Sequence, residues 1–79
     1  MVDVVSTLAN VAKAIVDNPD DVNVVIKDEN AERIILELVV ASDDMGKVIG
    51  KNGRIAKAIR QIIKTASTSI GKKVTVDIR

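Results

Sequence analysis

The segment Val48-Ile49-Gly50-Lys51-Asn52-Gly53-Arg54-Ile55 joins two stretches that predict helices, and its two glycines bracket two polar residues. Because glycine has no Cβ, such a segment can turn tightly and bring its backbone close to a ligand. The helix that follows Gly53 directs its first N–H groups to the same place, and helix N-termini attract anions. The pattern is equally typical of a plain turn with a glycine C-cap. The flanking sequence has to decide between a ligand loop and a turn.

Helices are predicted on both sides of this segment. Ser42 is the expected N-cap of the first, with Asp43 and Asp44 near the positive end of its dipole. That helix is short, because Gly50 follows eight residues later. The second helix begins after Gly53 and ends at Gly71 as a C-cap. Its apolar residues fall within an arc of about 100°: Ile55, Ile59, Ile62, Ile63, Ala66 and Ile70.

Three strands and one more helix are predicted from periodicity. Apolar residues at helical spacing predict a helix over residues 3–17, which Asn18-Pro19 stops. Alternating apolar residues predict strands at 22–26, 34–40 and 74–78, with turn chemistry at Asp28-Glu29-Asn30. The order is α-β-β-α-α-β.

The connections between these elements predict the topology. The first two strands pair antiparallel through their turn, whereas the two-helix crossover makes the second and third strands parallel neighbours. Ile35 and Val39 make the second strand apolar on both faces, so we expect it to be central and covered on both sides. The fold class is α/β (α+β), a two-layer sandwich with a three-stranded mixed sheet and the helices on one face.

Composition excludes most catalytic chemistry. The chain has 79 residues and contains no cysteine and no histidine, which removes disulfides, thiol nucleophiles, histidine metal sites and Ser-His catalysis. It also lacks Phe, Trp and Tyr, on which many RNA-binding folds stack bases. We therefore expect no enzyme, no cofactor and no metal.

The apolar share of 47% and the charged share of 29% are typical of a folded domain, so residues 1–79 are expected to form one domain. No apolar stretch approaches the 18 residues of a membrane span, and no export signal is visible. The cytoplasm is the expected location.

Charge is divided along the chain. Residues 1–44 carry three basic and ten acidic side chains, a net charge of −7, whereas residues 45–79 carry nine basic side chains and Asp77, a net charge of +8. This asymmetry predicts a polyanionic partner for the basic half. The alternative is an ordinary solvated surface whose charges happen to be sorted by half.

In this context, residues 48–55 resemble the VIGxxG signature of KH domains, whose GxxG loop clamps the backbone of four nucleotides. The extra N-terminal helix and strand are similar to the type II, prokaryotic-type order, and the length is similar to that of small stand-alone bacterial KH proteins. The resemblance covers the whole chain. It implies that Gly50, Lys51, Asn52 and Gly53 form a phosphate clamp, with Ile49 and the strand at 36–40 as an apolar floor for bases.

Basic residues near the loop are the remaining candidates for RNA contact. Lys47, Arg54 and Lys57 are expected to meet phosphates. Arg60 and Lys64 lie farther along the helix, where a solvated face is the favoured interpretation. Lys72 and Lys73 are weak candidates, because lysines are ordinary beside a strand.

Other patterns in the chain are better explained without chemistry. The stretch from Gly46 to Asn52 resembles a P-loop, but one residue is missing between its glycines and Asn52 replaces the required Ser or Thr. The carboxylate pairs Asp43-Asp44 and Asp20-Asp21 are ascribed to a helix N-terminus and to loop solvation, because adjacent residues diverge by about 100° on a helix.

The leading hypothesis is a non-catalytic protein that binds single-stranded RNA and acts as an RNA chaperone or post-transcriptional regulator. The alternative is an assembly module, because a small core without aromatics favours burial of the isoleucine stripe in an interface. The resemblance implies a homodimer and a heterodimer with a larger KH protein of the KhpB (Jag) type. Neither hypothesis needs a membrane.

Overall fold

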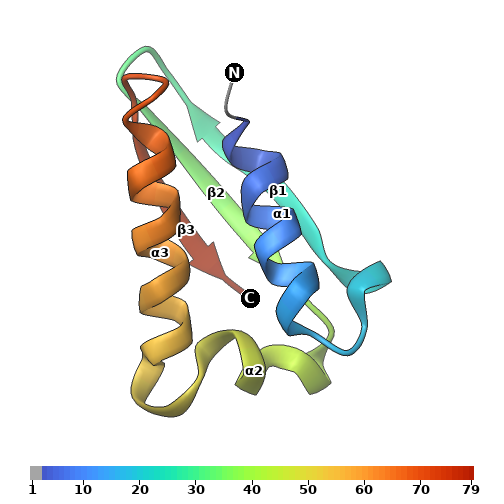
Figure 1. The fold of residues 1–79 in the computed structure, drawn as a ribbon. Helices are drawn as coiled ribbons and strands as arrows, with labels where there is room; N and C mark the ends of the chain where they lie inside the picture. Colours follow the sequence, from blue (N-terminus) through green and yellow to red (C-terminus); the bar gives the residue numbers. More distant parts are fainter. Residues whose placement is uncertain (1–2) are drawn as a thin grey trace.

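The computed structural model describes residues 3–79, in which three α-helices lie against a three-stranded sheet (Figure 1). The order is α1 (Val4–Ile15), β1 (Asn23–Glu29), β2 (Arg33–Val39), α2 (Met45–Ile49), α3 (Arg54–Ser67) and β3 (Lys73–Ile78). Three short 3-10 turns lie between these elements: η1 (Pro19–Asp21), η2 (Ser42–Asp44) and η3 (Lys51–Gly53). The predicted α-β-β-α-α-β order is confirmed.

The sheet has the predicted topology, with β2 in the centre. β1 pairs antiparallel with β2, which places Val24 opposite Leu38, and β2 pairs parallel with β3, which places Leu36 opposite Val76. The connection between the parallel strands passes through α2 and α3, since two parallel neighbours need a crossover. β1 and β3 are therefore the two edges of the sheet.

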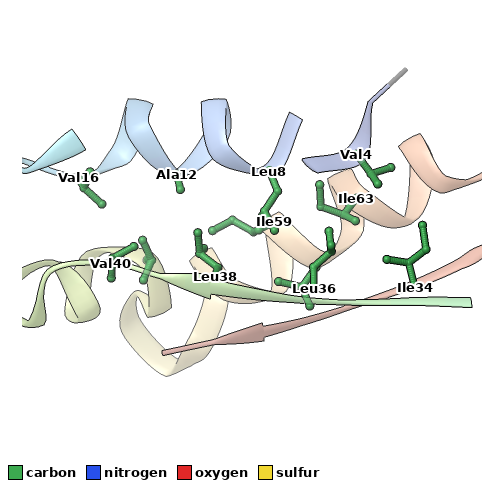
Figure 2. Packing of buried hydrophobic residues seen from close by; sticks show 12 residues of the cluster. Val4, Leu8, Ala12, Val16, Ile34, Leu36, Leu38, Val40, Ile59 and Ile63 are labelled. Atoms are coloured by element: carbon green, nitrogen blue, oxygen red, sulfur yellow. The ribbon is translucent and has the colours of Figure 1, made fainter. Parts of the chain in front are cut away.

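The core fills the space between the sheet and the helices α1 and α3. Figure 2 shows Leu8 of α1 and Ile59 of α3 meeting Leu36 and Leu38 of β2, and all four side chains are buried. These β2 residues alternate with others that point to the opposite face, as the period of a strand requires. α2 contributes Val48 to the same cluster and lies across one end of the sandwich (Figure 1).

Within residues 3–79 no helix covers the opposite face of β2, contrary to the prediction. Ile35 and Val39 are only half-buried there, because α1 and α3 both lie on the other side of the sheet. Within the described residues this open face carries ion pairs in place of a helix: Glu37 lies 3.6 Å from Lys27 and 3.8 Å from Arg79. Apolar residues on both faces of a strand thus did not mean cover on both faces.

Several predicted ends differ from the observed ones. α1 ends at Ile15 and not at residue 17, because Val16 is already extended ahead of Asn18-Pro19. The hairpin turn lies at residues 30–32, where the side chain of Asn30 accepts hydrogen bonds from the N–H groups of Glu32 (2.8 Å) and Arg33 (2.9 Å). The turn therefore follows the expected Asp28-Glu29-Asn30 segment, most of which belongs to β1.

The caps predicted at Ser42 and Gly71 are wrong. Ser42 is the first residue of η2 and its side chain caps no helix. α3 ends at Ser67 with Thr68 as C-cap, and a series of tight turns then leads to Gly71. The N–H of Gly71 still reaches the carbonyl of Ser67 at 3.2 Å, and its positive φ of 69° reverses the chain toward β3.

Candidate nucleic-acid interface

The four residues from Gly50 to Gly53 form a compact projection between α2 and α3. Gly50 ends α2 with a φ of 74°, and its carbonyl accepts the N–H of Gly53 at 3.2 Å. Asn52 has a φ of 57° and Gly53 a φ of 74°, so three of the four residues have positive φ. Asparagine tolerates this conformation better than other non-glycine residues. Glycine and asparagine therefore occupy the three loop positions at which the backbone has a positive φ.

The two glycines of the loop serve different purposes. A Cβ on Gly50 would lie 2.3 Å from Cγ1 of Ile55, so at this position the loop is packed against the first turn of α3. A Cβ on Gly53 would meet nothing within 4 Å. Gly53 therefore lies in open space, where another molecule can approach its backbone closely.

The first turn of α3 is suited to an anion. Its N-cap is Gly53, which has no side chain, and no side chain accepts a hydrogen bond at this cap in the part of the chain described. The N–H of Arg54 donates to the carbonyl of Lys51, but in general the first N–H groups of a helix lack intrahelical partners and carry a partial positive charge. Lys51, Arg54 and Lys57 are exposed around this point. An anion at the loop would meet both the helix end and these cations.

Lys47 is held differently from the other basic candidates. Its ammonium group forms an ion pair with the carboxylate of Asp17, at the end of α1. The hydrogen bond to Asp17 outweighs partial desolvation and raises the pKa of Lys47 above its ordinary value. Lys47 is therefore charged but already has a partner. A phosphate at this position would have to compete with Asp17.

A groove runs between α3 and the free edge of β3. It has a volume of about 510 Å³, and its lining combines three cations with hydroxyl and valine side chains. The guanidinium Nε of Arg60 donates a hydrogen bond to the carbonyl of Val76 at 3.3 Å, which fixes the side chain along the groove. The lining residues are Arg60, Lys64, Ser67, Thr68, Lys73, Val74, Thr75 and Val76.

This groove bears on two expectations about the site. The strand at 36–40 cannot be the floor for bases, because Leu36, Leu38 and Val40 are buried in the core of the central strand. The strand beside α3 is β3, whose Val74 is half-buried at the groove, whereas Val76 is buried in the core. Arg60 and Lys64 are exposed, as a solvated face requires, and they also line the groove.

A sequence signal for the groove existed in the predicted topology. The parallel pairing of β2 and β3 makes β3 an edge strand, and the crossover helix leading into it packs beside it. One side of that helix therefore runs along the edge of β3. Arg60 and Lys64 lie on this side of the helix. Ile49 is exposed (38%) at the end of α2, next to the loop and not inside the groove.

A second exposed surface lies on the other flank of α3. Ile55 and Ile62 are 37% and 44% exposed, whereas Ile59 and Ile63 of the same predicted stripe are buried. A shallow hollow at this surface is lined by Ala58, Gln61, Ile62 and Thr65. At about 100° per residue, this flank lies some 160° round the helix from the groove. We call the row Ile55, Ala58 and Ile62 the apolar row.

Two negative findings concern the described part of the chain alone. Residues 3–79 contain no group of three or more acidic side chains placed to hold a metal ion. None of the helices between these residues is long and apolar enough to span a bilayer.

Comparison with protein families gives one match over most of the chain. The family model described as "KhpA/KhpB, KH domain" matches residues 5–78. The matched region includes both helices that flank the loop, the groove and the whole sheet.

Several curated proteins are similar to this chain. "RNA-binding protein KhpA" of Clostridium perfringens is 56% identical over 86% of this chain and 89% of its own length. The protein of the same name from Clostridium acetobutylicum is 55% identical over 90% and 93%. That of Bacillus subtilis is 44% identical over 90% and 86%.

A solved structure of Aquifex aeolicus Era, bound to GDP and AlF4−, superposes with a TM-score of 0.70 at 19% identity. It covers 95% of this chain but only 29% of the Era chain. At this identity the match shows a shared fold and nothing more.

Proposed function

The chain belongs to the KhpA/KhpB family of KH domains, and from that premise we propose that it is a non-catalytic protein that binds single-stranded RNA through the loop Gly50–Gly53. Membership confirms the resemblance to KH domains, and the observed fold is the one expected for type II. The curated relatives are named as RNA-binding proteins. The observation that carries the proposal is the open backbone of Gly53 at the start of α3, where no side chain of the described residues caps the helix.

The loop supports the first part of this function, the holding of phosphates. A phosphodiester beside Gly53 meets the N–H groups of the first turn of α3, with no Cβ in its way. Lys51 and Arg54 supply charge from either side of that point, and Lys57 is one turn further along α3. Such contacts do not distinguish one base from another, because every nucleotide presents the same phosphate.

The groove between α3 and β3 supports the second part, the holding of bases. Lys57, Arg60 and Lys64 share one side of α3 and lead from the loop toward the groove, over roughly 15 Å from Arg54 at 1.5 Å per residue. Half-buried Val74 offers apolar contact at its floor, and Lys73 adds charge. Without aromatic stacking, each base forgoes about 1–3 kcal/mol. We therefore propose micromolar or weaker affinity with little sequence discrimination, which suits an RNA chaperone or a post-transcriptional regulator.

Self-association is the second property that we propose, and the apolar row supports it. Ile55 and Ile62 expose apolar surface that no described part of this chain covers. Because this row and the groove lie on opposite flanks of α3, a homodimer through the row leaves the groove free. The same surface suits a larger KH protein of the KhpB (Jag) type, a partner that we propose from family membership.

The proposal has consequences for domain organisation and location. One hydrophobic cluster takes residues from α1, β2, α2, α3 and β3, which supports residues 1–79 as a single KH domain. A protein that acts on cellular RNA would work in the cytoplasm.

The experiment that tests the proposal is a salt series with single-stranded and double-stranded RNA. Fluorescence anisotropy with an eight-uridine RNA is expected to give a log-log salt slope of about −0.7 for each phosphate contacted, hence roughly −2 to −3. The same length of RNA in a duplex is expected to bind more weakly, because paired bases are not available to the groove. A slope near zero, or a preference for the duplex, would contradict the proposal.

A further inference from the structure

Asp44 is an acidic side chain that the fold buries almost completely. Only 1% of the residue is exposed, whereas Asp43 beside it is exposed. A buried carboxylate is costly unless hydrogen bonds compensate it. Here three donors do so: the backbone N–H of Asp17 at 3.2 Å, the backbone N–H of Asn18 at 3.0 Å and the side-chain Nδ2 of Asn18 at 3.0 Å.

These donors connect distant parts of the chain. Asp17 and Asn18 directly follow the end of α1, whereas Asp44 is the residue immediately before α2. Lys47, three residues later and hence on the same side of the helix, pairs with the carboxylate of Asp17. The start of α2 is therefore attached twice to the same two residues after α1. The carboxylate of Asp44 is the buried attachment, and Lys47 is the exposed one.

The attachment matters because α2 meets the core through few side chains, the buried Val48 and the half-buried Met45. It has five residues, of which only Val48 is buried, and a helix this short is not stable alone. The loop Gly50–Gly53 follows α2 directly. A change in the direction of α2 at Asp44 would therefore displace the loop at its other end.

We propose that Asp44 is a positioning residue for the loop: by joining the end of α1 to the start of α2, its carboxylate holds Gly50–Gly53 in the geometry that receives phosphate. The part of this inference that concerns RNA rests on the proposed function. The part that concerns the free protein does not.

Charge alone predicts the opposite effect of removing Asp44. RNA is a polyanion, so replacing any aspartate by asparagine removes a repulsive charge and favours binding. Asp43→Asn is the matched control, because it makes the same change at the neighbouring, exposed position. In Asp44→Asn, an NH2 group replaces one acceptor oxygen, and it faces N–H donors. Positioning therefore predicts that Asp44→Asn weakens binding while Asp43→Asn does not.

The first measurement uses free protein. In ¹⁵N–¹H correlation spectra, Asp44→Asn is expected to shift or broaden the amide signals of Gly50 and Gly53, while that of Gly71, at the far end of α3, stays in place. Asp43→Asn is expected to leave the loop glycines unchanged. Asn18→Ala removes one of the three hydrogen bonds without changing charge, and it is expected to shift the loop glycines less.

The second measurement is the affinity for an eight-uridine RNA. We expect at least a fivefold loss in Asp44→Asn, a smaller loss in Asn18→Ala and an equal or slightly higher affinity in Asp43→Asn.

If folded Asp44→Asn keeps the wild-type signals of Gly50 and Gly53 and binds like Asp43→Asn, the inference is overturned. If Asp44→Asn does not fold, unchanged loop signals and affinity in Asn18→Ala overturn it. Wild-type protein that binds no RNA would remove the proposed function, but the glycine signals would still decide the role of Asp44.

Discussion

Gly50 and Ile55 are packed so closely that a Cβ on the glycine would lie 2.3 Å from Cγ1 and 2.9 Å from the backbone nitrogen of the isoleucine. The loop therefore closes on the first turn of α3 through its first glycine. Gly53, with the same φ of 74°, has open space around it. The two glycines of the motif differ in ψ, which is 175° at Gly50 and 15° at Gly53, as well as in surroundings, and these differences can be measured.

Gly50→Ala is expected to destabilise the protein more than Gly53→Ala. At Gly53, alanine meets only the cost of a left-handed conformation, about 1–2 kcal/mol. At Gly50 a φ of 74° with a ψ of 175° is a conformation essentially restricted to glycine, which costs alanine about 1–3 kcal/mol, and the clash with Ile55 adds about 1–3 kcal/mol. Urea unfolding followed by circular dichroism measures the difference. Ile55→Ala in the Gly50→Ala background should recover part of the loss, and an absence of any recovery would contradict the packing argument.

Replacing Lys51 and Asn52 together by Asp is expected to reduce RNA affinity at least tenfold, about 1.4 kcal/mol, with the fold preserved. Both side chains are exposed, and aspartate tolerates the positive φ of Asn52. The negative charges lie where the phosphodiester is proposed. Lys13→Asp, on the exposed side of α1, is the control. Equal losses in the two proteins would mean diffuse charge attraction without a clamp.

Lys72 and Lys73 are adjacent, but only one of them lines the groove. Lys72 forms an ion pair with Glu29 at 3.0 Å, whereas Lys73 borders the groove beside Arg60 and Lys64. Lys73→Ala is therefore expected to make the log-log salt slope of RNA binding shallower by about 0.7, and Lys72→Ala to leave it unchanged. Anisotropy at four salt concentrations distinguishes them. A groove that takes no part in binding would give the same slope in both variants.

Charges at Ile62 and Ile63 are expected to have different consequences. Ile63 is fully buried, so Ile63→Asp should unfold the domain, because an unpaired carboxylate in the core is strongly destabilising. Ile62 is 44% exposed, so Ile62→Asp should stay folded and lose self-association. Light scattering and circular dichroism give mass and fold together. A folded Ile62→Asp protein with the mass of a wild-type dimer would exclude the apolar row as the interface.

Stability is expected to fall at acidic pH and to change little between pH 5 and pH 8. A hydrogen bond from the side chain of Ser6 lowers the pKa of Asp3. At Asp44 burial raises the pKa, but the hydrogen bonds from Asn18 and Asp17 outweigh it, and the net pKa lies below its ordinary value of 3.8. A carboxyl group whose pKa is lower in the folded protein than in the unfolded chain stabilises the fold at pH values above its pKa in the unfolded chain. This stabilisation is lost as the pH falls through its pKa in the folded protein.

The chain has no histidine to titrate between pH 5 and 8. Lys47, with its raised pKa, contributes stability that is lost only as the pH rises through its folded pKa in the alkaline range. Urea midpoints from pH 2.5 to 8 test this, and Asp44→Asn should show a smaller decline below pH 4 than the wild type. An identical decline in the variant would mean that Asp44 is not among the carboxyls responsible.

The sequence by itself determined the order of elements, the pairing of the strands and the position of the loop. These depend on local patterns, namely the alternation in β2, the helical spacing in α1 and the glycine spacing at Gly50 and Gly53. Few topologies satisfy these patterns, because strands joined by a hairpin pair antiparallel and neighbouring strands joined by a crossover pair parallel. The KH resemblance follows from the same short patterns.

Only the tertiary structure decided which neighbour each side chain meets. Ile59 and Ile62 fall on one arc of α3, yet Ile59 is buried in the core and Ile62 is exposed. The helical period predicts which way a side chain points, but it does not predict how far the opposing surface extends. The sequence predicts that Asp44 lies at the start of a helix. It is buried because α1 ends beside α2, which brings Asp44 to Asn18, 26 residues earlier in the sequence. The groove likewise arises from the contact between α3 and the edge of β3, which no local pattern contains.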